Sequence, residues 1–267
     1  MQKKFGQNFL INPRIRKSLI EALGAKPGDD VWEIGPGLGA MTVMLLENKL
    51  NVKAFEIDNG FIRVLKNIFS QEENFCLVEG DAMKTCFKEP QAPFLLGNLP
   101  YNIAAALLAD FIEKKLIFSR MVVTVQKETA QRMAASPGSK DYSSFSVLCA
   151  SAYIVKPLMV IRKDSFYPQP NVESQGVLLE KKENTEVSEY FFPLVRALFS
   201  SRRKTIKNNL SQFLFSRYGN KLSSKTDVQD ICASIFNKNG LDGKERAETL
   251  CLDVFLSLAK SLENMRL

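Results

Sequence analysis

The chain contains no histidine. This absence excludes every mechanism in which a histidine acts as a base, a nucleophile or a metal ligand, including the serine and cysteine hydrolase triads. Five cysteines are present, and no two of them form a C-x-x-C pair: Cys76, Cys86, Cys149, Cys232 and Cys251. This scattering indicates reduced thiols in a cytoplasmic protein, with neither a disulfide framework nor a zinc site, so we expect no metal.

Long apolar runs are also missing. No segment approaches the roughly 20 apolar residues that span a bilayer, and we expect no secretion signal at the N-terminus, where no apolar stretch follows the charged residues. With 267 residues, of which 45% are hydrophobic and 24% charged, the composition is ordinary for a globular protein. This length is enough for one large domain and a smaller one.

Acidic residues are missing from one long stretch, which runs from Phe191 to Thr226. Eight basic residues lie within it: Arg196, Arg202, Arg203, Lys204, Lys207, Arg217, Lys221 and Lys225. The N-terminal segment is similar, because five basic residues precede its first acid, Glu21. A solvated helix face normally mixes both signs of charge. With a net charge of +7, the pattern favours a nucleic acid partner.

Three glycines stand between a strand-like and a helix-like segment, in the run Glu33-Ile34-Gly35-Pro36-Gly37-Leu38-Gly39. Glycines in this position let the backbone approach a ligand closely and direct helix N-terminal N–H groups at it. Further along, Glu56 ends the apolar segment 52–55, where a carboxylate can accept both hydroxyl hydrogens of a ribose. Glycines with a downstream acid fit a nicotinamide cofactor as well as S-adenosylmethionine.

Two details favour S-adenosylmethionine: the spacing E-x-G-x-G-x-G in place of a strict G-x-G-x-x-G, and a further acidic residue, Asp81. Asp81 follows the next strand-like run, 75–78, where it could bind the adenine amino group of the cofactor. Asn98 follows the apolar run 94–96 and opens the sequence Asn98-Leu99-Pro100-Tyr101. Because ligands bind at the carboxyl ends of strands in an open parallel sheet, we interpret these strand ends as a methyltransferase pocket.

The sequence Asn98-Leu99-Pro100-Tyr101 suits the methylation of an adenine amino group. The Asn98 side-chain oxygen and the Leu99 carbonyl can accept the two amino hydrogens, Pro100 stiffens the backbone, and Tyr101 can stack on the base. We expect Phe166 to cover the other face of the base. The structural alternatives are a strand-to-helix turn with Asn98 as N-cap and Tyr101 in the core, and a core aromatic at position 166.

Strand-like and helix-like segments alternate from Asp30 onward, which predicts an α/β domain with a mostly parallel, Rossmann-like sheet. We expect strands near 30–34, 52–56, 75–79, 93–97, 120–125, 153–161 and 175–181. The last two have no crossover helix between them, so we predict an antiparallel edge pair. Helical spacing continues after residue 183 without a convincing strand. We therefore expect a domain over residues 1–183 and a smaller all-helical domain over residues 184–267.

These motifs together resemble the ribosomal RNA adenine dimethyltransferases, and among them the small-subunit type tied to kasugamycin sensitivity. The resemblance covers nearly the whole chain. Its blocks are 4–10, 33–39, 98–102, 126–128, 166–174, 202–205 and 246–250. It implies a class I methyltransferase fold with a helical RNA-binding domain at the C-terminus, and it implies a monomer.

The resemblance also implies the reaction, in which S-adenosylmethionine methylates N6 of two adjacent adenosines in the terminal hairpin loop of 16S rRNA during small-subunit biogenesis. The positions that match the family's cofactor contacts are Asn8, Leu10, Gly35, Gly37, Glu56, Asp81 and Asn98. We predict phosphate contacts for four basic residues: Arg202, Arg203, Lys204 and Lys207.

Three other functions stay open from the sequence. The erythromycin-resistance type of enzyme dimethylates one adenine in 23S rRNA with similar motifs, although Leu99, Asn102 and the block 166–174 favour the 16S type. A non-catalytic assembly factor could keep the fold. A DNA adenine methyltransferase more often carries Asp-Pro-Pro-Tyr at the position of Asn98–Tyr101, and the helical domain has no evident major-groove reader.

Overall fold

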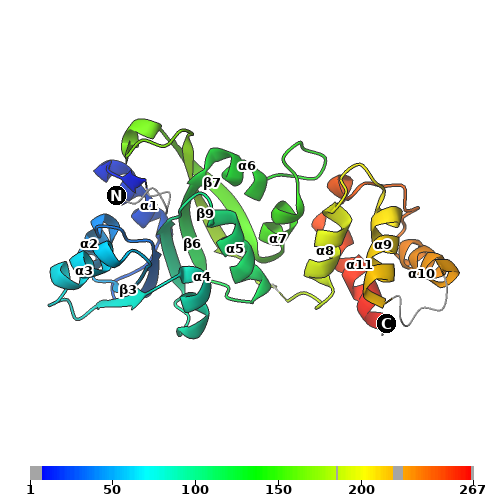
Figure 1. Cartoon of the computed structure of the whole chain (residues 1–267), viewed down its shortest axis with the longest axis horizontal. Coiled ribbons are helices and arrows are strands. Elements are labelled where there is room, and N and C mark those ends of the chain that lie inside the picture. Colours follow the sequence, from blue (N-terminus) through cyan, green and yellow to red (C-terminus); the bar gives the residue numbers. More distant parts are fainter. Residues whose placement is uncertain (1–7, 185, 219–224, 266–267) are drawn as a thin grey trace. The chain divides into compact units, whose positions relative to one another are not determined.

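The computed structural model describes residues 8–184, 186–218 and 225–265, which form two compact units (Figure 1). The first contains the chain up to Gln131 together with Ala152–Glu183, and the second contains Arg132–Ser151 and the chain from Asn184 onward. The sequence pattern places residues 132–151 in the first domain. In the structure they join the second unit, where the Tyr142 hydroxyl donates to the Leu250 carbonyl at 2.9 Å.

Seven strands form one sheet in the first unit, in the order β4-β3-β2-β5-β6-β9-β7. Their bounds are β2 Asp30–Ile34, β3 Asn51–Glu56, β4 Phe75–Glu79, β5 Phe94–Asn98, β6 Arg120–Gln126, β7 Tyr153–Ile161 and β9 Ser174–Lys181. The first five strands in this order pair in parallel, and β9 runs antiparallel to both β6 and β7. The predicted α/β class and antiparallel edge pair are confirmed.

The central strands are apolar because helices cover both faces of the sheet. On one face, Trp32 of β2 packs against Phe55 and Phe118, with ring centroids 4.7 and 5.4 Å apart. On the other face, a cluster that includes Leu19, Leu23, Leu45 and Leu96 is almost fully buried. The sheet is therefore a rigid support for the residues at its strand ends.

The helices of the first unit are α1 Pro13–Leu23, α2 Ala40–Glu47, α3 Asn59–Ile68, α4 Ala82–Thr85, α5 Ala104–Glu113 and α6 Lys127–Met133. Local signals set the ends of α1. The Asn12 side chain accepts hydrogen bonds from the N–H groups of Arg14 and Ile15, and Gly24 ends the helix in the left-handed conformation.

Two short strands lie outside the sequence expectations. β1 (Phe9–Leu10) pairs antiparallel with β8 (Phe166–Tyr167), with Leu10 opposite Phe166. Each strand has only two residues, which is too short for an alternating pattern. This pairing joins a segment near the N-terminus to the region that follows β7.

Helices make up the second unit: α7 Ser144–Ala152, α8 Phe191–Phe199, α9 Ile206–Tyr218, α10 Lys225–Lys238 and α11 Leu252–Asn264. α9 packs against α8 and α10, and α11 contacts α8 and α10. Their shared core includes Leu194, Leu198, Leu214, Phe255 and Leu262. Among the helices that the structure describes, none is long and apolar enough to cross a bilayer.

Candidate active site

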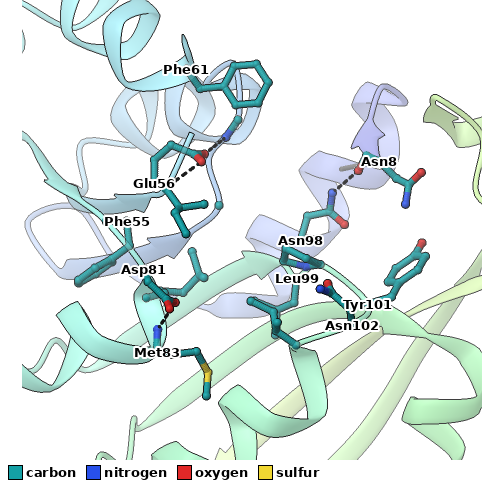
Figure 2. Close-up of a pocket in the computed structure, with 18 of the residues that line it drawn as sticks. Asn8, Phe55, Glu56, Phe61, Asp81, Met83, Asn98, Leu99, Tyr101 and Asn102 are labelled. Carbon is teal, nitrogen blue, oxygen red and sulfur yellow. Dashed lines mark hydrogen bonds between the residues drawn. The ribbon is translucent and has the colours of Figure 1, made fainter. Parts of the chain in front are cut away.

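A pocket opens at the carboxyl ends of the parallel strands (Figure 2). It brings together most of the residues that the sequence singled out: Asn8, Gly35, Gly37, Glu56, Asp81, Asn98, Leu99, Pro100 and Tyr101. Figure 2 shows the two carboxylates on one side of the pocket and Asn98 and Tyr101 on the other. The separate strand ends therefore form one site, as the parallel topology requires.

The glycine turn follows β2. Gly35 and Gly37 have φ angles of +68° and +58°, a region that glycine adopts without steric cost. A Cβ atom at Gly37 would lie 2.7 Å from the Phe9 ring, whereas a Cβ at Gly35 would meet only the Asn98 carbonyl at 4.0 Å. The backbone at Gly35 thus borders open space within the pocket.

Glu56 ends β3 and is held by backbone N–H groups. Its Oε1 accepts from Ile57 and Asp58, both at 2.9 Å, and its Oε2 accepts from Gly37 at 3.2 Å. Burial raises the pKa of this carboxyl, and the three backbone hydrogen bonds oppose the rise. An ionised carboxylate has about four acceptor positions, so Glu56 can still accept from a hydroxyl group.

Asp81 lies two residues beyond β4 and caps α4. Its Oδ1 accepts from the Met83 N–H at 3.0 Å. Within the described part of the chain, Oδ2 has no partner. Asp81 can therefore accept from an amino group in the pocket while it keeps its capping hydrogen bond.

Asn98 ends β5, and its amide is oriented by one hydrogen bond. Its Nδ2 donates to the backbone carbonyl of Asn8 at 2.7 Å. This bond uses the donor side of the carboxamide. Among the residues that the structure describes, neither Asn98 Oδ1 nor the Leu99 carbonyl receives a hydrogen bond. Two neutral oxygen acceptors are consequently available on consecutive residues.

Tyr101 lines the same pocket, and its hydroxyl is hydrogen-bonded to the Ser174 hydroxyl. Ser174 is the first residue of β9 and is fully buried. Burial raises the pKa of Tyr101, so the phenol stays neutral at physiological pH. Ser174 belongs to the family block 166–174, but the sequence alone indicates no role for it. The structure shows that it fixes the direction of the Tyr101 ring.

Two of the residues predicted to contact the cofactor or the target base do not line this pocket. Leu10 is buried in the core and borders an adjoining cavity next to the glycine turn. Phe166 is 1% exposed and belongs to the same core cluster as Leu10. The expected position of Phe166 over the base is therefore not what this structure shows, because the β1–β8 pairing holds its ring inside.

Glu33 is a buried carboxyl at the start of the glycine motif, for which the sequence predicts no separate role. Its Oε2 accepts from the Thr42 hydroxyl at 2.6 Å, and its Oε1 has no hydrogen-bond partner among the residues that the structure describes. Burial raises its pKa from 4.5 to about 7, and the nearby Glu56 adds to the rise. An acid between Trp32 and Ile34 in a buried strand is the signal that could have identified it.

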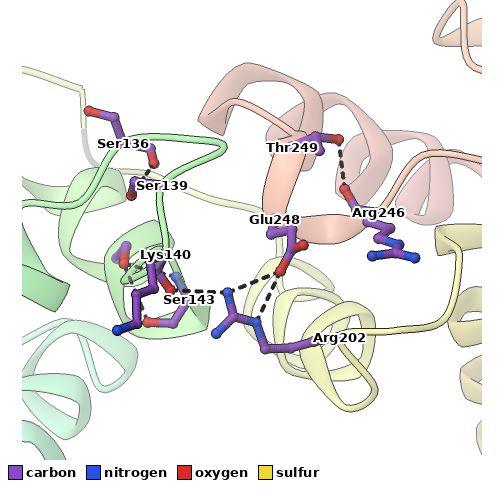
Figure 3. Close-up of polar contacts among 9 residues, drawn as sticks. Ser136, Ser139, Lys140, Ser143, Arg202, Arg246, Glu248 and Thr249 are labelled. Carbon is purple, nitrogen blue, oxygen red and sulfur yellow. Dashed lines mark hydrogen bonds and ion pairs between the residues drawn. The ribbon is translucent and has the colours of Figure 1, made fainter.

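The four predicted RNA contacts lie in the second unit and differ in their surroundings. Arg202 is ion-paired with Glu248 at 3.0 Å, and it donates to the Lys140 carbonyl at 3.2 Å (Figure 3). Arg203, Lys204 and Lys207 are exposed, and none of them is paired with a described residue. The last three are available to an external anion, whereas Arg202 joins segments of its own unit. Lys3 and Lys4, two of the five basic residues that precede Glu21, lie outside the described residues.

The donor set of the pocket fits S-adenosylmethionine. Glu56 has spare acceptor capacity for ribose hydroxyls, and Asp81 Oδ2 is open to an adenine amino group. Apolar side chains of Ile57, Phe61 and Met83 line the pocket beside these carboxylates. The open space at Gly35 admits a ligand close to the backbone.

Comparison with known proteins identifies the family. The family model described as ribosomal RNA adenine dimethylase matches residues 1–240. The chain belongs to this family. It is 47% identical to the ribosomal RNA small subunit methyltransferase A of Treponema denticola, over 97% of this chain and 88% of the relative. The protein of the same name from Bacillus cytotoxicus is 34% identical, over 98% of this chain and 91% of the relative.

Solved structures agree with this assignment. A dimethyladenosine transferase from Plasmodium falciparum superposes with a TM-score of 0.85 at 28% identity, over 97% of this chain and 98% of that one. The 23S rRNA methyltransferase ErmE has a TM-score of 0.67 at 19% identity, over 96% and 100%. The latter likeness concerns the fold alone. The fold is that of a class I methyltransferase, and the cofactor of the family is S-adenosylmethionine.

Proposed function

We propose that this protein transfers methyl groups from S-adenosylmethionine to N6 of two adjacent adenosines in the 3′-terminal hairpin loop of 16S rRNA. The products are dimethyladenosines in the small ribosomal subunit or its precursor. The observation that carries the proposal is a pair of acceptors, Asn98 Oδ1 and the Leu99 carbonyl, which receive no hydrogen bond from any described residue. Two acceptors on consecutive residues match the two hydrogens of an adenine amino group.

The acceptors address the main difficulty of the reaction. The amino nitrogen of adenine is a poor nucleophile because its lone pair is delocalised into the ring. Hydrogen bonds from this amino group to the Asn98 and Leu99 oxygens draw the nitrogen toward tetrahedral geometry and localise the lone pair. Because the acceptors are positioned before the substrate arrives, little reorganisation is needed during reaction.

The neutrality of Asn98 suits two successive transfers. Bound S-adenosylmethionine supplies a methyl group that is already activated by its sulfonium sulfur, so no acid catalyst is needed. A carboxamide adds no anion beside this positive charge. It also tolerates a nitrogen that has exchanged one hydrogen for a methyl group. The proton released from N6 after each transfer passes to water.

Tyr101 positions the base. A target adenosine has to leave its stack before N6 can be reached. The Tyr101 ring is held by the buried Ser174 hydroxyl, and it offers a fixed aromatic face on which the base can stack. A second stacking role for Phe166 would require its ring to become exposed.

The choice of 16S rRNA rests on the relatives. The proteins from T. denticola and B. cytotoxicus are both named small subunit methyltransferases and align over almost the whole chain. The exposed Arg203, Lys204 and Lys207 supply contacts to RNA phosphates. We place the reaction in the cytoplasm, where this RNA is assembled into particles, and we propose that the enzyme acts as a monomer.

Mass spectrometry of rRNA digests from cells with and without the gene tests the proposal. We expect two neighbouring dimethyladenosines in 16S rRNA that disappear with the gene and return with the wild-type chain but not with Asn98→Ala. A single dimethyladenosine in 23S rRNA would indicate the erythromycin-resistance type of activity. Unchanged rRNA, together with no calorimetric binding of S-adenosylmethionine, would indicate a non-catalytic assembly factor.

A further inference from the structure

We propose that a second, polar cavity beside the catalytic pocket binds the adenosine next to the one being methylated. This inference rests on the proposed function, since it concerns the second of two adjacent adenosines. The cavity has a volume of about 350 Å³, which is within the range of small-ligand sites. It lies in the first unit, between the end of β6 and the start of β9.

The position of this cavity follows from the strand register. On β6, Thr124 lies opposite Asn98 of β5, and Gln126 lies two residues further on, opposite Ser174 of β9. Gln126 lines the cavity, and Ser174 holds Tyr101 in the catalytic pocket. The backbone positions of Asn98 and Gln126, one residue from each site, are therefore offset by about one strand spacing of 4.8 Å and about 7 Å along the strand.

This separation exceeds the step of about 3.4 Å between stacked nucleotides. Two bases that occupy the two sites must be splayed apart, as bases are when proteins read single-stranded RNA loops. A hairpin loop supplies such bases. The target enters the pocket beside Asn98, and the neighbour reaches the cavity beside Gln126.

The charges of the cavity favour a base over a phosphate. Two lysines and two glutamates line it, so the formal charges cancel: Lys127, Lys163, Glu128 and Glu173. The Lys127 ammonium is 2.8 Å from Glu173 Oε2. This hydrogen bond and the charge of Lys127 lower the pKa of Glu173, which therefore stays ionised and can accept a hydrogen bond at neutral pH.

The polar groups of the cavity match the edge of an adenine. The amide residues Gln126, Gln131 and Asn171 border it together with the ion pair. Amides of this kind pair with the amino group and a ring nitrogen of adenine, and Glu173 can accept from the amino group. Guanine presents an oxygen in place of that amino group, so it would lose this hydrogen bond and place an oxygen near a carboxylate.

The test measures how methylation of one adenosine depends on its neighbour. Undermethylated small subunits are prepared with the loop dinucleotide AA, AG or GA, and kcat/KM per adenosine is measured. For the wild-type protein we expect a preference of at least tenfold for AA over the better of AG and GA. For Lys127→Met/Glu173→Gln we expect this preference to fall below threefold, with unchanged calorimetric affinity for S-adenosylmethionine.

A matched control is available on the same sheet. Lys53 and Glu89 form an ion pair of the same length, 2.8 Å, away from the cavity, and Lys53→Met/Glu89→Gln should keep the wild-type preference. The single variant Glu173→Gln keeps the shape of a side chain that is 42% exposed, so it tests the inference should the double variant fold poorly. It should lower the AA preference by itself.

Three outcomes would overturn this inference and leave the proposed function intact. They are equal wild-type kcat/KM values on AA, AG and GA, an unchanged AA preference in both cavity variants, or an equal loss of kcat/KM on all three substrates in those variants together with a weaker dependence of kcat/KM on salt. The last result would indicate a phosphate contact. Absence of adenosine methylation in 16S rRNA by the wild-type protein would instead overturn the proposed function.

Discussion

The side-chain amide of Asn98 donates a hydrogen bond of 2.7 Å to the backbone carbonyl of Asn8. This bond determines which end of the carboxamide faces the substrate, because it occupies the nitrogen and leaves the oxygen open. The last residue of β5 thus depends for its orientation on a residue near the start of the chain.

Replacement of Asn98 tests both the open side-chain oxygen and the nitrogen that donates to Asn8. Asn98→Ala should lower kcat for methylation about 100-fold, as expected for the loss of one positioned polar group. Asn98→Asp should be at least as damaging, because an ionised carboxylate repels the Asn8 carbonyl. Initial rates on undermethylated small subunits measure the effect. Activity of either variant within a few-fold of wild type would remove Asn98 from the chemistry.

The hydrogen bond between Tyr101 and Ser174 predicts non-additive effects. Tyr101→Phe and Ser174→Ala should each lower kcat/KM about fivefold, which corresponds to about 1 kcal/mol for one hydrogen bond. The double variant should be no worse than the more damaging single variant, because both remove the same interaction. Additive losses would show that Ser174 does not act through Tyr101.

Glu33 predicts a pH dependence of stability. Its folded-state pKa of about 7 exceeds the ordinary 4.5, so the native protein binds more protons than the unfolded chain between these values. The free energy of unfolding should therefore fall as the pH rises from 4.5 to 7, by about 3 kcal/mol at full effect, and stay low above that range.

Urea unfolding across this pH range measures the change through the fluorescence of Trp32, the chain's single tryptophan and the immediate neighbour of Glu33. Glu33→Gln should make the fall shallower, since the amide does not titrate. Glu56 stays in both proteins and contributes a fall of the same sign. Identical slopes for the two proteins would contradict an abnormal pKa at Glu33.

Substitutions of the basic residues of the second unit should fall into two groups, those that weaken RNA binding and those that lower stability. Arg203→Ala and Lys204→Ala should weaken RNA binding and each reduce the slope of log K against log salt by about 1, without lowering thermal stability. Arg202→Ala should destabilise the second unit by about 0.5–1 kcal/mol, because it removes a half-exposed ion pair with Glu248. Filter binding from 50 to 300 mM salt and thermal melts distinguish the groups. An equal change of slope for Arg202 would place it on the RNA as well.

Much of the sheet and of the pocket could be predicted from the sequence because both leave local signals. A strand buried on both faces is a short apolar run, and its end is marked by the first polar residue, as Asn98 follows Phe94–Leu96 and Glu56 follows Val52–Phe55. Parallel topology then brings these ends together. The caps of α1, Asn12 and Gly24, are local signals of the same kind.

Interactions between distant segments could not be predicted in this way. The burial of Phe166 depends on Leu10, and the direction of Tyr101 depends on Ser174. Residues 132–151 join the second unit through contacts such as that of Tyr142 with Leu250. The sequence shows which residue types are present in each segment, but their partners depend on the tertiary fold.

The reversed direction of β9 has a consequence for how such an enzyme can change its substrate. Because β9 enters the sheet at the catalytic edge, the segment between β8 and β9 can be lengthened or shortened while the pairings of both strands stay in place. The strand ends that form the pocket and the segment that precedes β9 are thus separate parts of the chain. Changes in that segment could adapt the enzyme to a new RNA target while the sheet keeps its fold.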